Sequence, residues 1–164
     1  MPMVRGPRVR SERGARLTVT EADVLGLLFK GHSTEEIARL RGCAFVTVEN
    51  HFDRMREKTG THTRTELIRR ALAEGWLQAP QISETAREAL AGHGGLSSGQ
   101  VKVLQLVFEG KTNKQIARAC WRDISNIERK IQRMMKKLEA QQRSELIYKA
   151  LSCNWLQPPK RYVD

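Results

Sequence analysis

The sequence has few aromatic residues, few cysteines and no long hydrophobic run. Aromatic side chains make up 5% of its 164 residues, and its three cysteines, Cys43, Cys120 and Cys153, form no CxxC pair. An odd number of scattered cysteines argues against a disulfide scaffold and favours a reducing, cytoplasmic compartment. The apolar runs are too short to cross a bilayer, so no membrane association is expected. Residues 1–16 are basic but contain no apolar segment, which argues against a secretory signal.

The residue clusters that enzymes and metal sites require are also missing. The four histidines, His32, His51, His62 and His93, are scattered, and none has a second ligand at a familiar spacing. The sequence contains no clustered carboxylates, no Ser/His/Asp arrangement and no phosphate-binding loop. We therefore predict no metal, no cofactor and no enzymatic activity, and a nuclease or recombinase is disfavoured.

What the sequence has in excess is positive charge. Lys and Arg outnumber Asp and Glu by 29 to 18, and the formal charge is +11. A solvated basic surface would explain this excess without any partner. An anionic polymer is nevertheless the favoured partner of a small basic protein, because its charge is an electrostatic footprint for such a ligand.

The chain also contains an internal repeat. Residues 17–80 align without a gap with residues 96–159, at an offset of 79 positions, and 23 of the 64 aligned pairs are identical. This self-similarity indicates a duplicated module. The predicted domains are a basic tail (1–16), module one (17–80), a linker (81–95), module two (96–159) and a short tail (160–164). Within the linker, Ser83 can cap a short helix over Glu84 to Ala91.

Each module is predicted to be all-α with four helices, because its apolar residues recur at helical spacing and no alternating strand pattern is present. In module one the third helix should run from Phe45 to about Thr59, with Val48, Phe52 and Met55 facing inward. Two short helices, a tight turn and a longer helix with a narrow core stripe form a helix-turn-helix. Most of the third helix is then left exposed, as a helix that enters a DNA groove requires.

Local signals predict how some helices begin. Ser33 or Thr34, followed by Glu36, forms a capping box at the second helix of module one. Asp123 can cap the third helix of module two, whereas Ala44 at the matching place cannot. We also expect two of the thiols, Cys43 and Cys120, to lie in the core, and the tryptophans Trp76 and Trp155 to pack the end of each fourth helix.

Residues 17–68, which begin LTVTEADVLGLLFKGHSTEEIARL, resemble the LuxR/FixJ (GerE-like) DNA-binding domain. The positions of module one that carry the resemblance are Leu17, Thr18, Glu21, Val24, Leu25, Leu27, Gly31, Ser33, Glu36, Ile37, Ala38, Thr47, Val48, His51, Lys58, Arg64, Glu66 and Leu67. Module two is a more distant copy that keeps Leu96, Val103, Leu104, Gly110, Thr112, Ile116, Ala117, Lys137, Leu138, Arg143, Glu145 and Leu146. It replaces Glu21, Gly42 and His51 by Gln100, Trp121 and Lys130, respectively.

The resemblance covers about three quarters of the chain. It implies a bacterial transcription regulator, associated with the nucleoid, that binds specific promoter or operator sequences in double-stranded DNA with its third helices in the major groove. Members of this family usually carry a receiver or ligand-binding domain ahead of the DNA-binding domain, and residues 1–16 are too few to form one. The resemblance therefore leaves activity to be set by abundance or by a partner.

With the core stripes turned inward, the remaining positions of the third helices predict the DNA contacts. The base-facing side chains are Glu49, Asn50, Asp53, Glu128, Arg129 and Gln132, since groove-bound ridges meet base edges. The phosphate-facing side chains are Thr47, His51, Arg54, Lys58, Lys130, Arg133, Lys136 and Lys137. Arg129 can bind guanine O6 and N7, Gln132 suits adenine, and Glu128 can accept from cytosine N4. For any single residue of this set, a solvated helix surface is the alternative.

The positive charge is unevenly divided between the modules. Residues 17–77 contain nine basic and nine acidic side chains, whereas residues 96–156 contain twelve and five. Either the modules read different half-sites as a covalent pseudo-dimer, or module one has turned toward a protein such as RNA polymerase, which would make the chain an adaptor. We favour the first interpretation because module one keeps the groove-docking residues Thr47, Val48 and His51.

The fourth helices carry apolar residues beyond those that one small core needs. The predicted pairing face consists of Leu67, Ile68, Ala71, Leu146, Ile147 and Ala150. These residues should meet either within one chain or between two chains. A homodimer is the favoured expectation, because family pairing surfaces are self-complementary and isologous pairs are the commonest oligomers.

Overall fold

The structure, a computed structural model, describes residues 17–81, 84, 88 and 95–160. Its helices are α1 (Val19–Phe29), α2 (Thr34–Arg41), α3 (Phe45–Thr59), α4 (Arg64–Ala73), α6 (Ser98–Phe108), α7 (Asn113–Cys120), α8 (Ile124–Lys137) and α9 (Arg143–Ser152). The described residues form no strand, so the all-α fold with two tandem modules is confirmed. The expected linker helix lies outside the described residues, apart from Glu84 and Glu88, which are helical.

Capping boxes start five of the described helices: α1, α2, α4, α6 and α7. In α2, the Ser33 hydroxyl accepts from the Glu36 backbone N–H at 3.2 Å, and the Glu36 carboxylate accepts from the Ser33 N–H at 2.8 Å. The capping box predicted for this helix is therefore confirmed. Each such cap is worth about 1 kcal/mol, because it satisfies backbone donors that have no partner inside the helix.

The third helices of the two modules, α3 and α8, start without a side-chain cap. The missing cap was predicted for Ala44, but the cap predicted for Asp123 is wrong, although Asp123 does occupy the N-cap position. The carbonyl of Asp123 accepts the N–H groups of both Asn126 and Ile127, at 3.1 and 3.2 Å. The N–H of Asn126, which an N-cap carboxylate could have accepted, is thus bonded to backbone, and the Asp123 side chain stays exposed.

One hydrophobic cluster runs through both modules. The predicted inward residues of α3 and their equivalents on α8 are all buried: Val48, Phe52, Met55, Ile127, Ile131 and Met134. Trp76 is 8% exposed, and Trp155 packs against the same cluster, so their predicted places are confirmed.

The thiols differ from expectation. Cys43 and Cys120 are half-buried at the edge of the core, because Cys43 lies in the turn after α2 and Cys120 is the last residue of α7, and the prediction of core thiols is wrong for them. Cys153 is the buried cysteine, and burial raises the pKa of its thiol above its ordinary value.

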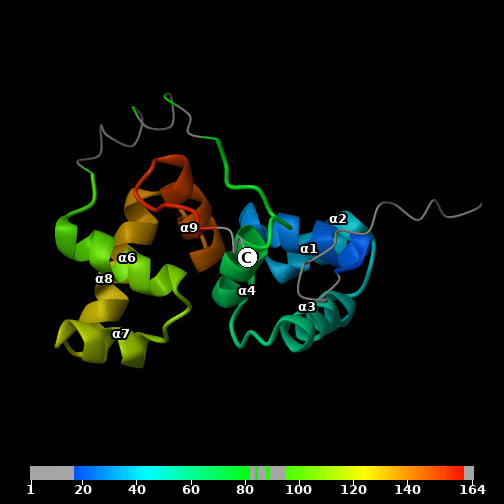
Figure 1. Cartoon of the computed structure of the whole chain (residues 1–164), viewed down its shortest axis with the longest axis horizontal. Helices are drawn as coiled ribbons and strands as arrows, with labels where there is room; N and C mark the ends of the chain where they lie inside the picture. The colour runs from blue at the N-terminus through cyan, green and yellow to red at the C-terminus, as the bar shows by residue number, and fades with distance from the viewer. Residues whose placement is uncertain (1–16, 82–83, 85–87, 89–94, 161–164) are drawn as a thin grey trace, which may run out of the picture.

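The two modules pack against each other along α4 and α9. Figure 1 shows module one on the right, module two on the left and these two helices between them. α1 of module one also packs on α9, and its counterpart α6 packs on α4, so equivalent helix pairs meet in both directions. The interface therefore has the reciprocal contacts of an isologous dimer, although it joins two halves of one chain.

Two glycines lie in this interface under two glutamates. A Cβ atom on Gly31 would lie 2.7 Å from both Cβ and Cγ of Glu145. A Cβ on Gly110, the equivalent of Gly31, would come even closer to Cγ of Glu66, the equivalent of Glu145. The duplication has thus placed the same close contact on both sides of the interface.

Two further contacts between the modules have no counterpart on the other side of the interface among the described residues. The Gln142 side chain donates to the carbonyl of Gly31 at 2.5 Å. The rings of Phe29 and Tyr148 meet edge to face, with 5.1 Å between centroids. Such aromatic pairs stabilise by about 0.5–1.5 kcal/mol beyond their buried area.

Candidate nucleic-acid interface

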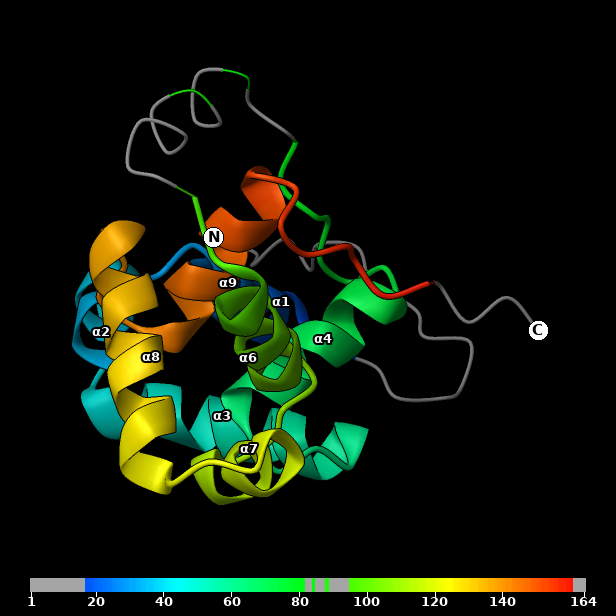
Figure 2. The ribbon, with the colours of Figure 1, turned by 90° about the vertical axis from the view of Figure 1, so that its left-hand side faces the viewer.

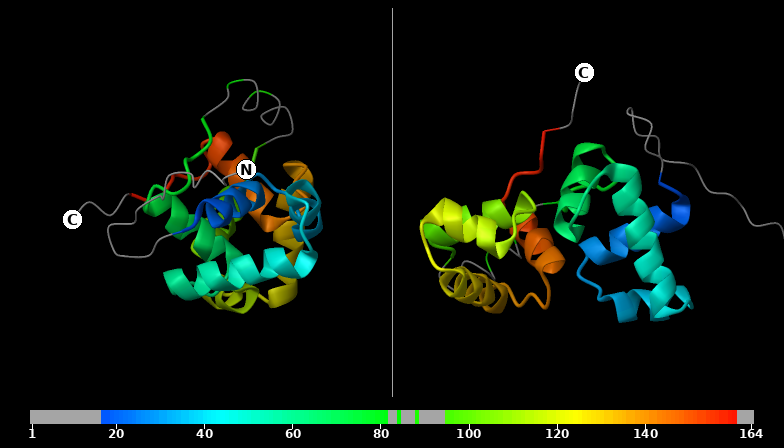
Figure 3. Two further views of the ribbon diagram at one scale, coloured as in Figure 1. Left: turned by 90° about the vertical axis from the view of Figure 1, so that its right-hand side faces the viewer. Right: turned by 90° about the horizontal axis from the view of Figure 1, so that it is seen from below.

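The third helices, α3 and α8, lie on opposite sides of the α4–α9 pair, as the view from below in Figure 3 shows. Each begins directly after the turn that follows the second helix of its module, and Figure 2 shows α8 rising from its contact with α7. This arrangement leaves the outer ridge of each third helix open to solvent. The described residues therefore form two helix-turn-helix modules in tandem.

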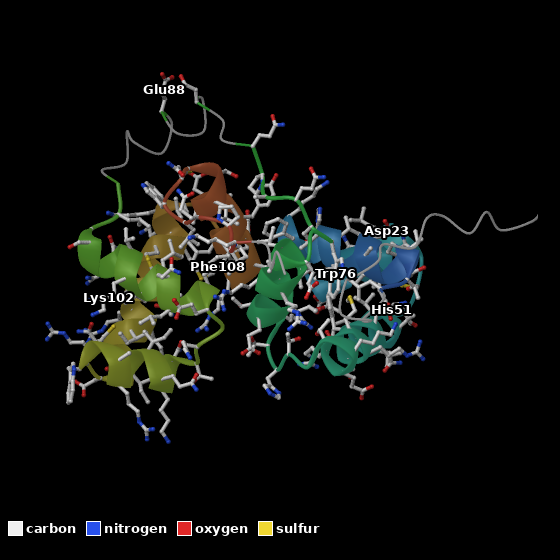
Figure 4. All side chains as sticks on the ribbon, in the orientation of Figure 1. Asp23, His51, Trp76, Glu88, Lys102 and Phe108 are labelled. Carbon is white, nitrogen blue, oxygen red and sulfur yellow. The ribbon has the colours of Figure 1, made fainter. Side chains whose placement is uncertain are left out.

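Most of the predicted DNA-facing side chains are accessible. Those that are exposed are Asn50, Asp53, Arg54, Lys58, Glu128, Arg129, Gln132, Arg133 and Lys136. Those that are half-buried are Thr47, Glu49, His51, Lys130 and Lys137. His51 lies in the half of module one that faces away from module two (Figure 4). Contact of these residues with DNA stays a prediction.

The Glu49 carboxylate is held inside module one. Its Oε1 accepts from the Thr34 hydroxyl at 3.0 Å and from the Arg64 guanidinium at 2.5 Å. Arg64 in turn lies over the Phe52 ring, 4.5 Å from its centroid, which fixes the guanidinium in place. Glu49 would have to leave these partners before it could accept from a base.

The equivalent carboxylate in module two is freer. Glu128 is exposed and accepts only a long hydrogen bond, 3.4 Å, from the Asn113 amide. Arg143, the equivalent of Arg64, donates to the side-chain Oδ1 of Asn113 at 2.6 Å and makes no ion pair with Glu128 in the described structure. The change from Thr34 to Asn113 thus inserts a neutral group between the arginine and the carboxylate.

Asp53, the other acid on the module-one ridge, is also paired. It forms an ion pair with Arg56, one turn further along α3. The two carboxylates on the ridge of module one are therefore paired with Arg56 and Arg64. The ridge repels a polyanion less than its sequence indicates, because these arginines neutralise its negative charges.

Lys58 has a structural partner that its predicted phosphate role did not include. Its ammonium group donates to both carboxylate oxygens of Glu21 at 2.8 Å, and the Glu21 side chain is only 3% exposed. A carboxylate this deeply buried needs a counter-charge, because desolvation otherwise disfavours its ionised form. Part of the positive charge of module one is thereby used inside the module.

Module two lacks this internal neutralisation. Gln100 stands in place of Glu21, and Lys137 donates instead to the backbone carbonyl of Gly95 at 2.9 Å. The acceptor is neutral, so the lysine keeps its full charge toward solvent. A shallow pocket of about 610 Å³ opens beside it and is lined by Ser97, Gln100, Lys130, Arg133, Lys136, Lys137 and Glu139.

Large apolar side chains are exposed at both helix-turn-helix turns, a feature that helical periodicity did not predict. In module one they are Leu40, Phe45 and Val46, which are 61%, 48% and 61% exposed. In module two they are Trp121, 92% exposed, and Ile124, 44% exposed. The replacement of the turn glycine by Trp121 was visible in the sequence and could have drawn attention to this surface.

Comparison with known proteins identifies the family. Residues 15–71 and 95–150 both match the model of bacterial regulatory proteins, luxR family. Since the two segments together cover more than half of the chain, the chain belongs to this family. The tandem LuxR-type helix-turn-helix domains inferred from the sequence are therefore confirmed, and DNA binding and a role in the regulation of transcription are supported.

One curated relative is similar over a single module's length. The chain is 42% identical over 67 residues to a transcriptional regulatory protein, MctR, of Rhizobium johnstonii. The match spans 40% of this chain and 31% of MctR, so it covers about a third of that protein's length. No solved structure is significantly similar to the chain.

Two further observations concern only the described residues. None of the helices there is long and apolar enough to cross a membrane. No group of three His, Cys, Asp or Glu side chains gathers there as metal ligands would, and the absence of a metal, a cofactor and an enzymatic activity stays a prediction.

Proposed function

We propose that this chain regulates transcription at the nucleoid by sequence-specific binding to promoter or operator DNA, with α3 and α8 each in a major groove. The observation that carries the proposal is the pair of exposed polar ridges on third helices that the α4–α9 interface holds together. A groove-bound helix needs such a ridge, since base edges are read by side chains that no core contact restrains. Membership of the LuxR family supports the same conclusion.

We further propose that one chain acts as a pseudo-dimer that covers two half-sites. The six residues of the predicted pairing face are fully buried within the single chain, and their helices pack reciprocally on each other's modules. A homodimer through the same face would first have to expose it. Joining both readers in one chain also makes the second groove contact intramolecular, which raises affinity without new contacts.

Module two carries more of the affinity in this proposal. Its cations Lys130, Arg133 and Lys136 surround an exposed ridge, whereas the acids and Lys58 of module one are paired internally. Affinity for DNA depends strongly on counterions released at phosphates, while specificity depends on base edges. Module one would then mainly lengthen the DNA sequence that is recognised and would contribute less to the affinity.

The test is selection of binding sites by the full chain from a random duplex pool. Titration against the selected and a scrambled duplex should then follow at several salt concentrations. We expect two half-sites in the selected duplex and at least about a thousandfold preference for it. Light scattering should give one chain per duplex. Equal affinity for both duplexes would contradict sequence-specific regulation, and two chains per duplex would restore the homodimer.

An adaptor role is the second candidate, and the exposed apolar residues of module one favour it. Leu40, Phe45 and Val46 would dock poorly on phosphates but well on a protein surface such as one of RNA polymerase. If the chain is an adaptor, purified polymerase should retain it in the absence of DNA. It also predicts that the double change Leu40→Ser and Val46→Ser abolishes this retention while DNA binding is unchanged. Failure of the wild-type chain to bind polymerase would exclude this candidate.

A further inference from the structure

Trp121 is the most exposed large apolar side chain among the described residues. It ends α7 in the left-handed region, with φ 52° and ψ 49°, and it is 92% exposed. In the described part of the chain its indole makes neither a hydrogen bond nor a ring contact. The Trp121 side chain therefore contributes no contact that would stabilise the fold.

The same backbone conformation occurs in module one with a residue that suits it better. Gly42 has φ 61° at the equivalent turn, and an added Cβ would meet nothing within 4 Å. A left-handed conformation is unfavourable for a residue with a side chain and neutral for glycine. Trp121 thus adds backbone strain and exposes a large apolar surface, and no contact in the described part of the chain compensates for either.

The surroundings of Trp121 indicate the chemistry of a ligand that would cover the indole. The indole borders an open depression of about 890 Å³ that is also lined by the exposed Ile124 and by three cations and one acid: Lys114, Arg118, Arg122 and Asp123. An apolar centre with three cations around it matches a polyanion that also offers apolar rings. Nucleic acids have this composition, since sugars and bases alternate with phosphates, and base–aromatic stacking is a common mode of binding them.

The depression is continuous with the proposed DNA-reading helix. It includes Ser125 and Asn126 in the first turn of α8, so a duplex lying along α8 would reach the indole. Module one has no such site, because Glu35 and Cys43 occupy the places of Lys114 and Arg122. Trp121, Lys114 and Arg122 are therefore specific to module two, whereas Arg118 has an equivalent in Arg39 of module one.

We propose that Trp121 is a DNA-contacting residue, whose indole packs on a sugar or base at the edge of the module-two half-site. Lys114, Arg118 and Arg122 bind the adjacent phosphates and hold the strand against the ring. This assignment rests on the proposed function, and it adds a contact that depends little on salt, because an uncharged ring releases no counterions. Module two thus binds DNA beyond the ridge of its recognition helix.

The first experiment compares Trp121→Gly with the wild-type chain on the selected duplex. The variant restores the glycine that module one has, so it should fold at least as well, which thermal unfolding checks. We expect affinity to fall by about tenfold, within the range of a lost base–aromatic stack, with an unchanged salt slope. Arg118→Ala should instead lower the salt slope by about one. Gly42→Trp is the matched control and should bring no gain, because module one has only one of the three cations, Arg39, and has Glu35 and Cys43 at the other two places.

A second measurement observes the indole directly. Acrylamide should quench the fluorescence of exposed Trp121 in the free chain, and the selected duplex should protect it, with Trp121→Gly as the baseline for Trp76 and Trp155. Failure of the wild-type chain to bind the selected duplex would contradict the proposed function itself. Normal binding by Trp121→Gly, with an indole that remains quenchable on DNA, would overturn only this inference. Protection by RNA polymerase and not by DNA would overturn it too and would assign the residue to a protein contact.

Discussion

Glu145 lies so close over Gly31 that a methyl group on the glycine would come within 2.7 Å of the Glu145 Cβ. The same glutamate carboxylate accepts from the Gln141 N–H at 2.8 Å and pairs with Lys149 at 2.9 Å. It is therefore fixed and cannot easily turn aside. Because Glu66 and Gly110 repeat the arrangement, the contact between modules depends on two positions without a side chain.

Gly31→Ala and Gly110→Ala should each lower the free energy of unfolding by about 2–4 kcal/mol, the sum of left-handed strain and an overpacked contact. Gly42→Ala is the matched control, because its φ is also positive but the space around it is open. It should cost only about 1–2 kcal/mol, from strain alone. Urea unfolding measures all three. Equal losses at Gly31 and Gly42 would mean that the glutamate moves away freely.

The other left-handed positions follow from the same reasoning. At three turns module two has a side chain with positive φ where module one has glycine: Trp121, Glu139 and Asn154. At the fourth such position both modules keep glycine, as Gly31 and its equivalent Gly110. Around Gly42 and Gly60 an added Cβ would meet nothing, so a side chain is tolerated there at the cost of strain alone. At Gly31 and Gly110 a side chain is not tolerated, because it would overlap Glu145 or Glu66. The repeat has diverged at its turns where space allowed it.

Glu139→Gly should therefore stabilise the chain by about 0.5–1 kcal/mol, since relief of left-handed strain exceeds the added entropy of the unfolded chain. The Glu139 carbonyl keeps its hydrogen bond from Lys149, because that acceptor is backbone. The reciprocal variant Gly60→Glu should destabilise module one by a similar amount. Thermal unfolding of both variants checks the prediction, and a loss of stability in Glu139→Gly would contradict it.

Helix positions were readable from the sequence, and the fate of individual charges was not. The span predicted for α3, Phe45 to about Thr59, agrees with the structure because the apolar spacing and Gly60 both define it. The pairing of Glu49 with Arg64 and of Lys58 with Glu21 joins different helices. Sequence spacing reports which face a residue occupies but not which distant side chain reaches it.

The place where the fourth helices meet was also undetermined. Their apolar faces predict a partner, but the same pattern fits contact within one chain and contact between two. In this structure the fourth helices α4 and α9 contact each other within one chain, and Phe29 and Tyr148 add a ring contact between the modules. The turn tryptophan was noted as a substitution in the sequence, whereas its exposure needed the fold.

Glu21→Gln would give module one the residue that module two has at this position. Lys58 would lose its buried counter-charge and become available to phosphate, so the salt slope of DNA binding should steepen by about one. Stability should fall by about 1–3 kcal/mol, because a charged hydrogen-bond pair is lost. Gln100→Glu should give Lys137 a carboxylate partner and make the salt slope of DNA binding shallower by a similar amount. Anisotropy titrations at several salt concentrations measure both slopes, and unchanged slopes would show that these lysines stay away from DNA.

Thiol reactivity should follow burial. Burial raises the pKa of the Cys153 thiol, so at a given pH it holds less of the reactive thiolate than an ordinary cysteine does. Cys43 and Cys120 are half-buried and should react first with an aromatic disulfide reagent at pH 8. Cys153 should react only as the chain unfolds, which mass spectrometry of the labelled peptides can test in low and high urea. Early labelling of Cys153 would contradict its burial.

The last prediction concerns the different contributions of the two modules to DNA affinity and sequence specificity. Arg133→Ala should weaken binding about equally on all sequences and reduce the salt slope by roughly one, because it removes a phosphate contact. Arg129→Ala should cost about 1–3 kcal/mol on the selected duplex and relax the preference at one guanine. Arg129 now donates to the Ser125 carbonyl at 3.3 Å, a bond that it must leave to reach a base.

Asn50→Ala is the module-one counterpart of these variants. Asn50 is exposed and suits adenine, so its loss should alter the preferred site with a smaller effect on affinity than either arginine. Each variant should be titrated against the selected and scrambled duplexes at several salt concentrations. If Asn50→Ala abolished binding while Arg129→Ala and Arg133→Ala left affinity and salt slope unchanged, module one would be the main reader. The internal pairing of Glu49 and Asp53 would then leave Asn50 as the base-reading residue of that ridge.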